Sequence, residues 1–262
     1  MNLSRSLYYY LPCKDDTLVE DKIMELAMKH PVEGQDKIYW RIRSEGITWN
    51  KKRIRRVYLK LRLNKRMRKR KRIPARVKEP LYIPQQAGEI WSMDFMHDSL
   101  ISGRKFRVLN VIDDYNREAM AIEAHLSIGS KLVTQILENI VHEKGLPKAI
   151  RVDNGPEFIA STLSDWCYER KIKLQFIQPG KPSQNALIER FNRTYRENVL
   201  DAYLFENLNQ VRILSEEWMQ EYNYTRPHEA LKGKSPIQYK LAEQSLEASF
   251  KALHLTHQYE LN

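Results

Sequence analysis

The chain lacks most features of secreted and membrane-embedded proteins. Only two of its 262 residues are cysteines, Cys13 and Cys167, so a disulfide framework is excluded and a reducing compartment is expected. No apolar run approaches the ~20 residues that span a bilayer, and the first residues lack the apolar core of a signal peptide. Internal repeats and sustained heptads are also missing. We therefore expect a cytoplasmic protein without membrane contact.

Acidic residues are missing from one long stretch. Residues 51–72 contain fourteen Lys or Arg and no Asp or Glu, whereas the whole chain carries +11. The other residues therefore carry −3, the difference between +11 and +14. Such a run is often only a solvated face or a disordered tail. Here Ile54, Val57, Tyr58 and Leu61 follow helical spacing, which indicates that the first half is folded. The block favours a polyanionic partner, namely DNA.

Three short helices are predicted around this block. The first should run over residues 17–29, opened by a capping box from Thr17 to Glu20. The second should run over residues 35–45 and stop at Gly46, and the third should begin after Asn50. Three short helices with a glycine between the last two resemble a helix-turn-helix domain. Its candidate DNA-binding residues, mostly phosphate contacts, are Lys51, Lys52, Arg53, Arg55, Arg56, Arg62, Lys65, Arg66, Arg68, Lys69 and Arg70.

Prolines separate this basic domain from the rest of the chain. Residues 73–89 hold three prolines and little periodicity, which is typical of a linker. We expect four segments: a helical basic domain (1–72), the linker (73–89), an α/β core (90–205) and a C-terminal helical extension (206–262). The elements expected after the linker are strands at 90–97, 105–112, 119–124, 149–152 and 172–177, and helices at 130–144, through Leu163 and Trp166, at 183–200, at 208–222 and from Ser235-Pro236 onward.

Three carboxylates stand out within the core. Asp94 lies inside an apolar strand, Asp153 follows a short strand, and Glu189 lies in a segment with helical spacing. Acidic residues occupy 33 of 262 positions, so their spacing alone is weak evidence for a metal site. Mg²⁺ nevertheless prefers carboxylate oxygens and is completed by phosphate oxygens. Two such ions about 3.5–4 Å apart can activate an attacking oxygen and stabilise a leaving one. The three residue types therefore suggest divalent-metal phosphoryl transfer.

The residues around these carboxylates strengthen that interpretation. The chain contains, in this order, WSMDF, LNVIDDYNRE, IRVDNGPEF, PGKPSQNALIERFN and YNYTRPHEAL. It closely resembles, over nearly its whole length, the insertion-sequence transposases of the family named after insertion sequence number three. The match is to the product of the second reading frame, OrfB. The resemblance implies an α/β, ribonuclease-H-like integrase core, with a mixed five-stranded sheet and flanking helices, behind the small all-α basic domain.

The resemblance also implies a catalytic site. It assigns the DDE catalytic triad to Asp94, Asp153 and Glu189, which would bind two Mg²⁺ ions, with Mn²⁺ as a substitute. If the strand before Asp153 pairs beside the Asp94 strand, both carboxylates lie toward one sheet edge, where open α/β sheets bind ligands. The helix with Glu189 must then pack across that edge. This adjacency is implied by the resemblance to ribonuclease-H folds and does not follow from the spacing.

Four further residues are candidate DNA contacts near the triad. Integrase-like enzymes carry a basic residue seven positions after the last carboxylate, and Arg196 matches it. Arg193 shares the same helix face, although both could be solvent-facing arginines. Lys181 and Asn185 lie in the loop before this helix and are expected to touch the DNA end.

Other acidic residues in the core are expected to be structural. Asp113 and Asp114 end a strand antiparallel to the first, so they should cap a turn at the opposite edge of the sheet. Asp98, Glu157 and His97 are not expected to bind metal, because helix-dipole or strand-end roles explain them.

We expect a DNA transposase of a bacterial insertion sequence that performs strand cleavage and strand transfer. Its expected partners are double-stranded DNA, further copies of itself on DNA, and the first-reading-frame product or a fusion with it. It is expected in the bacterial cytoplasm at the nucleoid. The zinc module of retroviral integrases is excluded because Cys13 is alone in the N-terminal region. Two alternatives stay open: a decayed or domesticated copy that regulates DNA without catalysis, and a structure-specific nuclease with the same fold.

Overall fold

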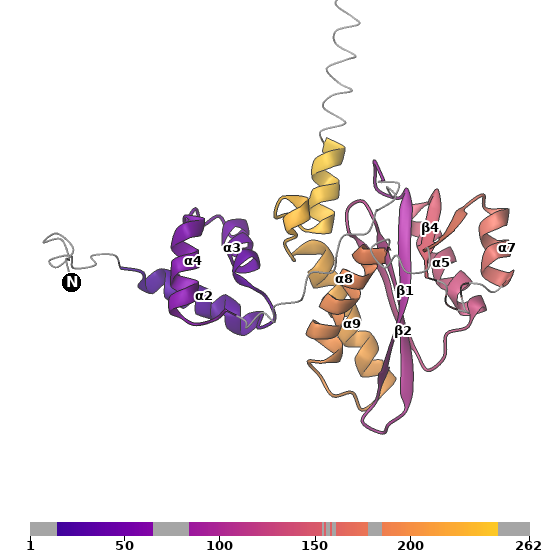
Figure 1. The fold of residues 1–262 in the computed structure, drawn as a ribbon, viewed down its shortest axis with the longest axis horizontal. Coiled ribbons are helices and arrows are strands. Elements are labelled where there is room, and N and C mark those ends of the chain that lie inside the picture. Colours follow the sequence, from indigo (N-terminus) through magenta and orange to yellow (C-terminus); the bar gives the residue numbers. More distant parts are fainter. Residues whose placement is uncertain are drawn as a thin grey trace, which may run out of the picture. The chain divides into compact units, whose positions relative to one another are not determined.

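The computed structural model describes residues 15–64, 84–153, 155, 158, 161–177 and 185–245. The chain divides into two units, Met1–Ile73 and Pro74–Asn262, which are described separately below. Figure 1 shows the elements of both units. Residues 73–83 of the predicted linker lie outside the described part. None of the described helices is long and apolar enough to cross a membrane.

The first unit contains three described helices, α2 (Thr17–Lys29), α3 (Gln35–Ser44) and α4 (Lys51–Lys60). One apolar residue per turn or more from each helix enters a shared core, whose fully buried members include Ile23, Ile38, Ile42, Ile54 and Val57. A buried ion pair between Arg41 and Glu33 (2.7 Å) adds a polar contact. The three predicted helices are therefore confirmed.

The helix ends in this unit have distinct chemical causes. Asn50 accepts the backbone N–H of Lys52 at 2.8 Å, which satisfies an orphan donor at the start of α4. Gly46 follows α3 with φ 84°, a conformation that favours glycine. The predicted capping box is wrong: the N-cap of α2 is Asp16, and Thr17 is already helical. The backbone N–H and hydroxyl of Thr17 both donate to the Asp15 carboxylate, because a charged acceptor competes well for them.

The second unit is built on one five-stranded sheet. Its strands are β1 (Ile90–Ser99), β2 (Lys105–Asp113), β3 (Ala119–His125), β4 (Ala149–Val152) and β5 (Lys173–Phe176). Their order across the sheet is β3-β2-β1-β4-β5. β1 pairs antiparallel with β2 and parallel with β4, so the sheet is mixed, as predicted.

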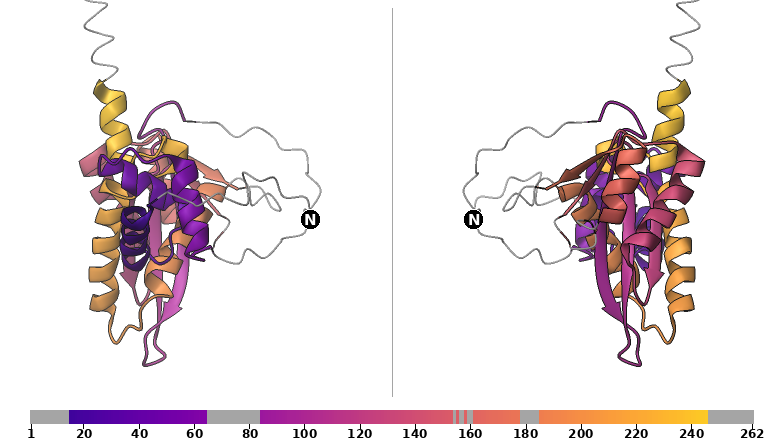
Figure 2. Two further views of the ribbon diagram at one scale, coloured as in Figure 1. Left: turned by 90° about the vertical axis from the view of Figure 1, so that its left-hand side faces the viewer. Right: turned by 90° about the vertical axis from the view of Figure 1, so that its right-hand side faces the viewer.

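Helices cover both faces of this sheet, as Figure 1 and the side views of Figure 2 show. Alternate residues of β1 point to opposite faces: Trp91 and Met93 join the core beneath α5 (Ser130–Lys144) and α7 (Ser161–Glu169). Met96 joins the core beneath α8 (Ala186–Tyr195) and α9 (Leu208–Tyr224). The sheet is therefore buried on both sides, and a polar side chain within β1 must have a specific partner or function.

The helix that follows β5 differs from its prediction. Residues 178–184 lie outside the described part, and α8 continues into a π-helical turn, η2 (Arg196–Leu200).

β5 alternates weakly, since Phe176 is exposed and Leu174 only partly buried at this edge of the sheet. The strand predicted at residues 172–177 is therefore present, with one residue fewer at each end.

The opposite edge strand, β3, is covered by α9. The side chain of Asn223 accepts the backbone N–H of Ala119 and donates to its carbonyl oxygen, both at 2.8 Å. The Nε of Arg212 donates to the carbonyl oxygen of Ala124 at 2.9 Å. Asn223 belongs to the YNYTRPHEAL segment, whose role the sequence did not explain. In the structure this part of the segment joins α9 to the sheet.

The end of the described chain follows the predicted pattern. Ser235 precedes a helix over residues 236–245, and its hydroxyl accepts the backbone N–H of Gln238 at 3.4 Å. The predicted segments 90–205 and 206–262 both fall in the second unit, and α9 shares a core with β1 and β2. The boundary at residue 205 therefore stays a prediction.

Candidate active site

Two of the three carboxylates belong to neighbouring parallel strands: Asp94 lies within β1, and Asp153 directly follows β4. β1 and β4 pair with Trp91 opposite Ile150 and Ser92 opposite Arg151. Two residues further along each strand come Asp94 and Asp153. This register places the two acids at the same height in the sheet, near the carboxyl end of β4, where open α/β sheets bind ligands.

The third carboxylate is carried by α8. The apolar face of this helix buries Ile188, Phe191 and Tyr195, while Glu189 is exposed. Asn192, one turn after Glu189, donates from Nδ2 to Oδ2 of Asp94 at 2.8 Å. That bond fixes α8 against β1 beside Asp94.

The charges of the other two carboxylates act on Asp94. Burial, with a smaller contribution from the charges of Asp153 and Glu189, raises the pKa of Asp94 to about 6, against the hydrogen bonds that it accepts from Phe95 and Asn192. Asp94 therefore lies within electrostatic reach of both other acids. A cation among them would remove this repulsion. Because all three offer hard oxygen donors, the set fits a hard divalent metal ion such as Mg²⁺.

Two asparagines at this site were not predicted. Asn110 of β2 lies opposite Asp94 in the β1–β2 register. It is fully buried, and its Nδ2 donates to Oδ1 of Asn192 at 2.7 Å. Asn192 in turn donates to Asp94, so the two amides form a chain that fixes the carboxylate orientation. Asn192 could have been found from its position three residues after Glu189. Asn110 could have been found only from the register of the hairpin.

Asp153 is held by the turn that follows β4. Its Oδ1 accepts the backbone N–H of Gly155 at 2.9 Å, an arrangement typical of an Asx turn. Asn154 and Pro156, on either side of Gly155, lie outside the described residues.

The acids that were expected to be structural have structural contacts. Asp113 accepts the backbone N–H of Tyr115 at 2.7 Å, which confirms its predicted turn-capping role. The predicted turn-capping role of Asp114 is wrong, because its carboxylate forms a buried ion pair with Arg151 at 2.5 Å. Glu157 lies outside the described residues, and His97 is exposed at the far end of β1.

Arg196 makes protein contacts that the sequence did not predict. Its guanidinium donates to Oδ2 of Asp98 at 3.0 Å and to the carbonyl oxygen of His97 at 2.8 Å. Arg193 is exposed and has no ion pair with any residue in the described ranges. Asn185 is buried at the start of α8, and its Oδ1 accepts no hydrogen bond from the described residues. The predicted DNA contacts of these three residues stay predictions, and Lys181 lies outside the described part.

The predicted DNA-binding block of the first unit is only partly described. Lys51, Lys52, Arg53, Arg55 and Arg56 lie on α4, and Arg62 is exposed just after it. The other predicted cations lie outside the described residues: Lys65, Arg66, Arg68, Lys69 and Arg70.

The chain is similar to proteins of known families over most of its length. Residues 84–182 and 170–236 match two family models, each described as an integrase core domain. The 31.7 kDa protein of insertion element IS407 from Burkholderia multivorans is 35% identical over 241 residues, which cover 91% of this chain and 87% of that protein. The 39.2 kDa protein of insertion element IS476 from Xanthomonas euvesicatoria is 32% identical over 239 residues, covering 90% of this chain and 69% of that protein.

Solved structures show the same fold. A chain in the structure of the simian T-cell lymphotropic virus intasome, in complex with PP2A regulatory subunit B56 gamma, matches with a TM-score of 0.53 at 15% identity. The match covers 84% of this chain and 74% of that chain, and it indicates the fold alone. The ribonuclease-H-like integrase fold expected from the sequence is thereby confirmed. Taken with the sequence identity to both insertion-element proteins, this makes the chain a member of the insertion-element transposase family with an integrase-like core.

Proposed function

We infer that the protein is a DNA transposase, a polynucleotidyl transferase that cleaves and joins DNA strands. The observation that supports this function is the position of Asp94 and Asp153 at one height of an integrase-like sheet, with the helix of Glu189 bonded to Asp94 through Asn192. Carboxylates so arranged suit metal-assisted phosphoryl transfer, because they supply hard oxygen donors to divalent ions.

We propose that Asp94, Asp153 and Glu189 are the catalytic residues and hold divalent metal ions, Mg²⁺ in the cell. When bound, two such ions supply activation of the attacking oxygen and stabilisation of the leaving oxygen. Asn192 and the Gly155 N–H orient the Asp94 and Asp153 carboxylates. Water or a DNA 3′-hydroxyl attacks the phosphodiester in line. Cys167 is no candidate nucleophile, because burial raises the pKa of its thiol to about 11.

We propose a finer assignment on the residues quoted from the sequence. The protein is the second-reading-frame product of an element of the family named after insertion sequence number three. It works as an oligomer on double-stranded DNA, with the first-reading-frame product or as a fusion with it, at the bacterial nucleoid. The basic domain at residues 1–72 binds DNA, and the core at residues 90–205 performs the chemistry.

The function is tested with a preassembled branched DNA that mimics a strand-transfer product. The full chain should resolve and rejoin this substrate only when Mg²⁺ or Mn²⁺ is added, as read on a denaturing gel. Cleavage without joining would favour the structure-specific nuclease. Tight DNA binding without either reaction, under any divalent metal, would favour the non-catalytic regulator.

Replacing Asn192 with Ala should lower the Mn²⁺ affinity of the full chain by about 10- to 100-fold. The variant removes the Nδ2 donor to Asp94 without removing a carboxylate, so the metal ligands remain but their orientation is lost. Isothermal titration with Mn²⁺ measures the affinity, and strand transfer at saturating Mn²⁺ should largely recover.

The matched control is Thr194→Ala on the same helix, because its hydroxyl donates to the carbonyl oxygen of Arg190 and to no other described residue. It should bind Mn²⁺ as the wild type does. An Asn192→Ala protein with wild-type Mn²⁺ affinity would show that the amide chain does not position Asp94.

A further inference from the structure

Five of the six cations of α4 fall into two groups that the sequence does not separate, and the sixth, Lys51, pairs with Asp36 of α3 at 2.8 Å. The first group consists of Arg53, Arg56 and Lys60 and is called the α2-facing group. Arg53 and Arg56 both pair with the Asp16 carboxylate, at 2.8 and 2.6 Å, and Lys60 pairs with Glu20 at 2.5 Å. These three cations therefore serve as contacts between α4 and the start of α2.

Asp16 is the carboxylate at the centre of this group, and its burial and charge suit it to hold α4 against α2. Asp16 is only 7% exposed, and the hydrogen bond from Arg53 lowers its pKa, so it stays charged near neutral pH. Arg53 also donates to the carbonyl oxygen of Asp15 at 2.7 Å. Two arginines thus hold one buried acid at the helix junction, and this acid compensates one of their two charges within the protein.

The second group lies beside the first on the same helix. It consists of Lys52, Arg55 and Leu59 and is called the outer face. All three are exposed, Leu59 by 49%, and neither cation has an ion pair with any residue in the described ranges. A helix turns about 100° per residue, so the outer face spans an arc of about 60° next to the α2-facing arc.

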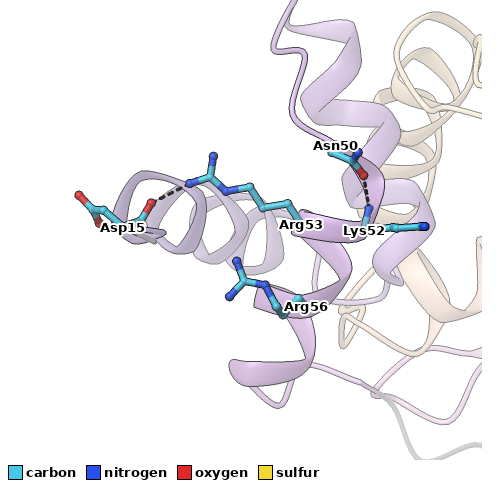
Figure 3. A pocket seen from close by; sticks show the side chains of 5 residues that line it. All are labelled: Asp15, Asn50, Lys52, Arg53 and Arg56. Atoms are coloured by element: carbon cyan, nitrogen blue, oxygen red, sulfur yellow. Dashed lines mark hydrogen bonds between the residues drawn. The ribbon is translucent and has the colours of Figure 1, made fainter. Parts of the chain in front are cut away.

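Figure 3 shows the boundary between the two groups. Asp15, Asn50, Lys52, Arg53 and Arg56 line a hollow of about 620 Å³ at the start of α4. Arg53 and Arg56 extend toward the Asp15 side of this hollow, whereas Lys52 extends away from it. Neighbouring cations of α4 therefore extend in different directions, some toward α2 and others away from it.

We propose that the outer face of α4 contacts duplex DNA, whereas the α2-facing group holds the helices together. This inference rests on the proposed function and names the DNA-contacting side of its basic domain. An exposed α-helix fits the major groove of duplex DNA. On such a helix, cations without an acidic partner can contact phosphates, and an apolar side chain between them can contact a base edge. α4 is also the second helix of the α3–turn–α4 pair, the one that enters the groove in helix-turn-helix proteins. Among the described residues, the acids that pair with α4 are Asp16 and Glu20, on the α2 side, and Asp36 of α3.

The test compares two adjacent arginines, Arg55→Gln and Arg56→Gln, in the full-length chain. Binding to a fluorescent random-sequence duplex is measured across a salt series. Arg55→Gln should bind severalfold more weakly and reduce the logarithmic salt slope by about 0.9, as for one lost phosphate contact. Arg56→Gln should keep the wild-type slope but unfold at a lower urea concentration, because Asp16 loses one partner. Lys52→Gln should behave like Arg55→Gln.

Each outcome bears on the inference. Equal loss of slope in Arg55→Gln and Arg56→Gln would overturn the division into two groups. A wild-type slope in both Arg55→Gln and Lys52→Gln would remove the outer face from the DNA interface. Neither result tests the proposed function. That function would be contradicted if the wild-type chain showed no metal-dependent strand transfer on the branched substrate.

Discussion

Replacing Asp94 with Asn should abolish Mg²⁺-dependent strand transfer while leaving duplex DNA affinity nearly unchanged. The variant keeps the shape of the side chain but removes a negative charge from the proposed metal site. Metal ions stabilise such transition states by several kcal/mol, and about 1.4 kcal/mol corresponds to a tenfold change in rate. We therefore expect a loss of about 10³-fold or more, measured as the rate of strand joining on the branched substrate.

Asp153→Asn and Glu189→Gln should have the same effect, since all three carboxylates are proposed to share the metal ions. Asp165→Asn is the control, because Asp165 is exposed on α7, on the opposite face of the sheet from α8. It should retain wild-type joining. If any one of the three variants joined strands at near the wild-type rate, the catalytic role of that residue would be wrong.

The largest expected effect on folding comes from Arg151→Met. Arg151 and Asp114 form an ion pair at 2.5 Å in which the side chains are 6% and 0% exposed. Removing one member of a buried pair leaves an uncompensated charge and typically costs about 3–5 kcal/mol. Urea unfolding followed by circular dichroism should show a clear decrease in the midpoint concentration.

Two measurements separate this mechanism from a simple packing defect. The double variant Arg151→Met with Asp114→Leu should recover most of the lost stability, because no charge remains buried. Burial already raises the pKa of Asp114, and Arg151 opposes that rise. In Arg151→Met the folded protein therefore binds a proton at Asp114 more tightly than the unfolded chain does. Its deficit relative to the wild type should shrink as the pH falls from 7 toward about 4. A deficit independent of pH would contradict the proposed mechanism.

The local elements of the protein could be predicted from sequence because their signals are local. Apolar periodicity gave α5 its observed bounds, Ser130–Lys144, and the Asn50 cap marked the start of α4. The carboxylates of the candidate site were found through residue type and family resemblance. Their adjacency depends on the parallel register of β1 and β4, and spacing along the chain does not encode a register.

Apart from the Thr17–Asp15 contacts, the contacts that sequence reasoning missed join distant segments. Asn110 and Asn192 are 82 residues apart, and Arg53 lies 37 residues after Asp16. A run of fourteen cations looks uniform in the sequence. Its division into ion-paired and exposed residues arises only when α2 and α3 bring their acids against α4. The same holds for Arg196, since its partner Asp98 lies in another element.

The bonds from α9 to β3 have a consequence for the solubility of shortened chains. An unpaired edge strand is a template on which other molecules can add strands and aggregate. The Asn223 amide imitates the peptide group of a missing neighbour at Ala119, and Arg212 occupies the carbonyl oxygen of Ala124. A chain cut before α9 would present these groups to solvent, and it should sediment as concentration-dependent aggregates. By covering the edge of β3, α9 thus protects the sheet that carries the carboxylates from aggregation.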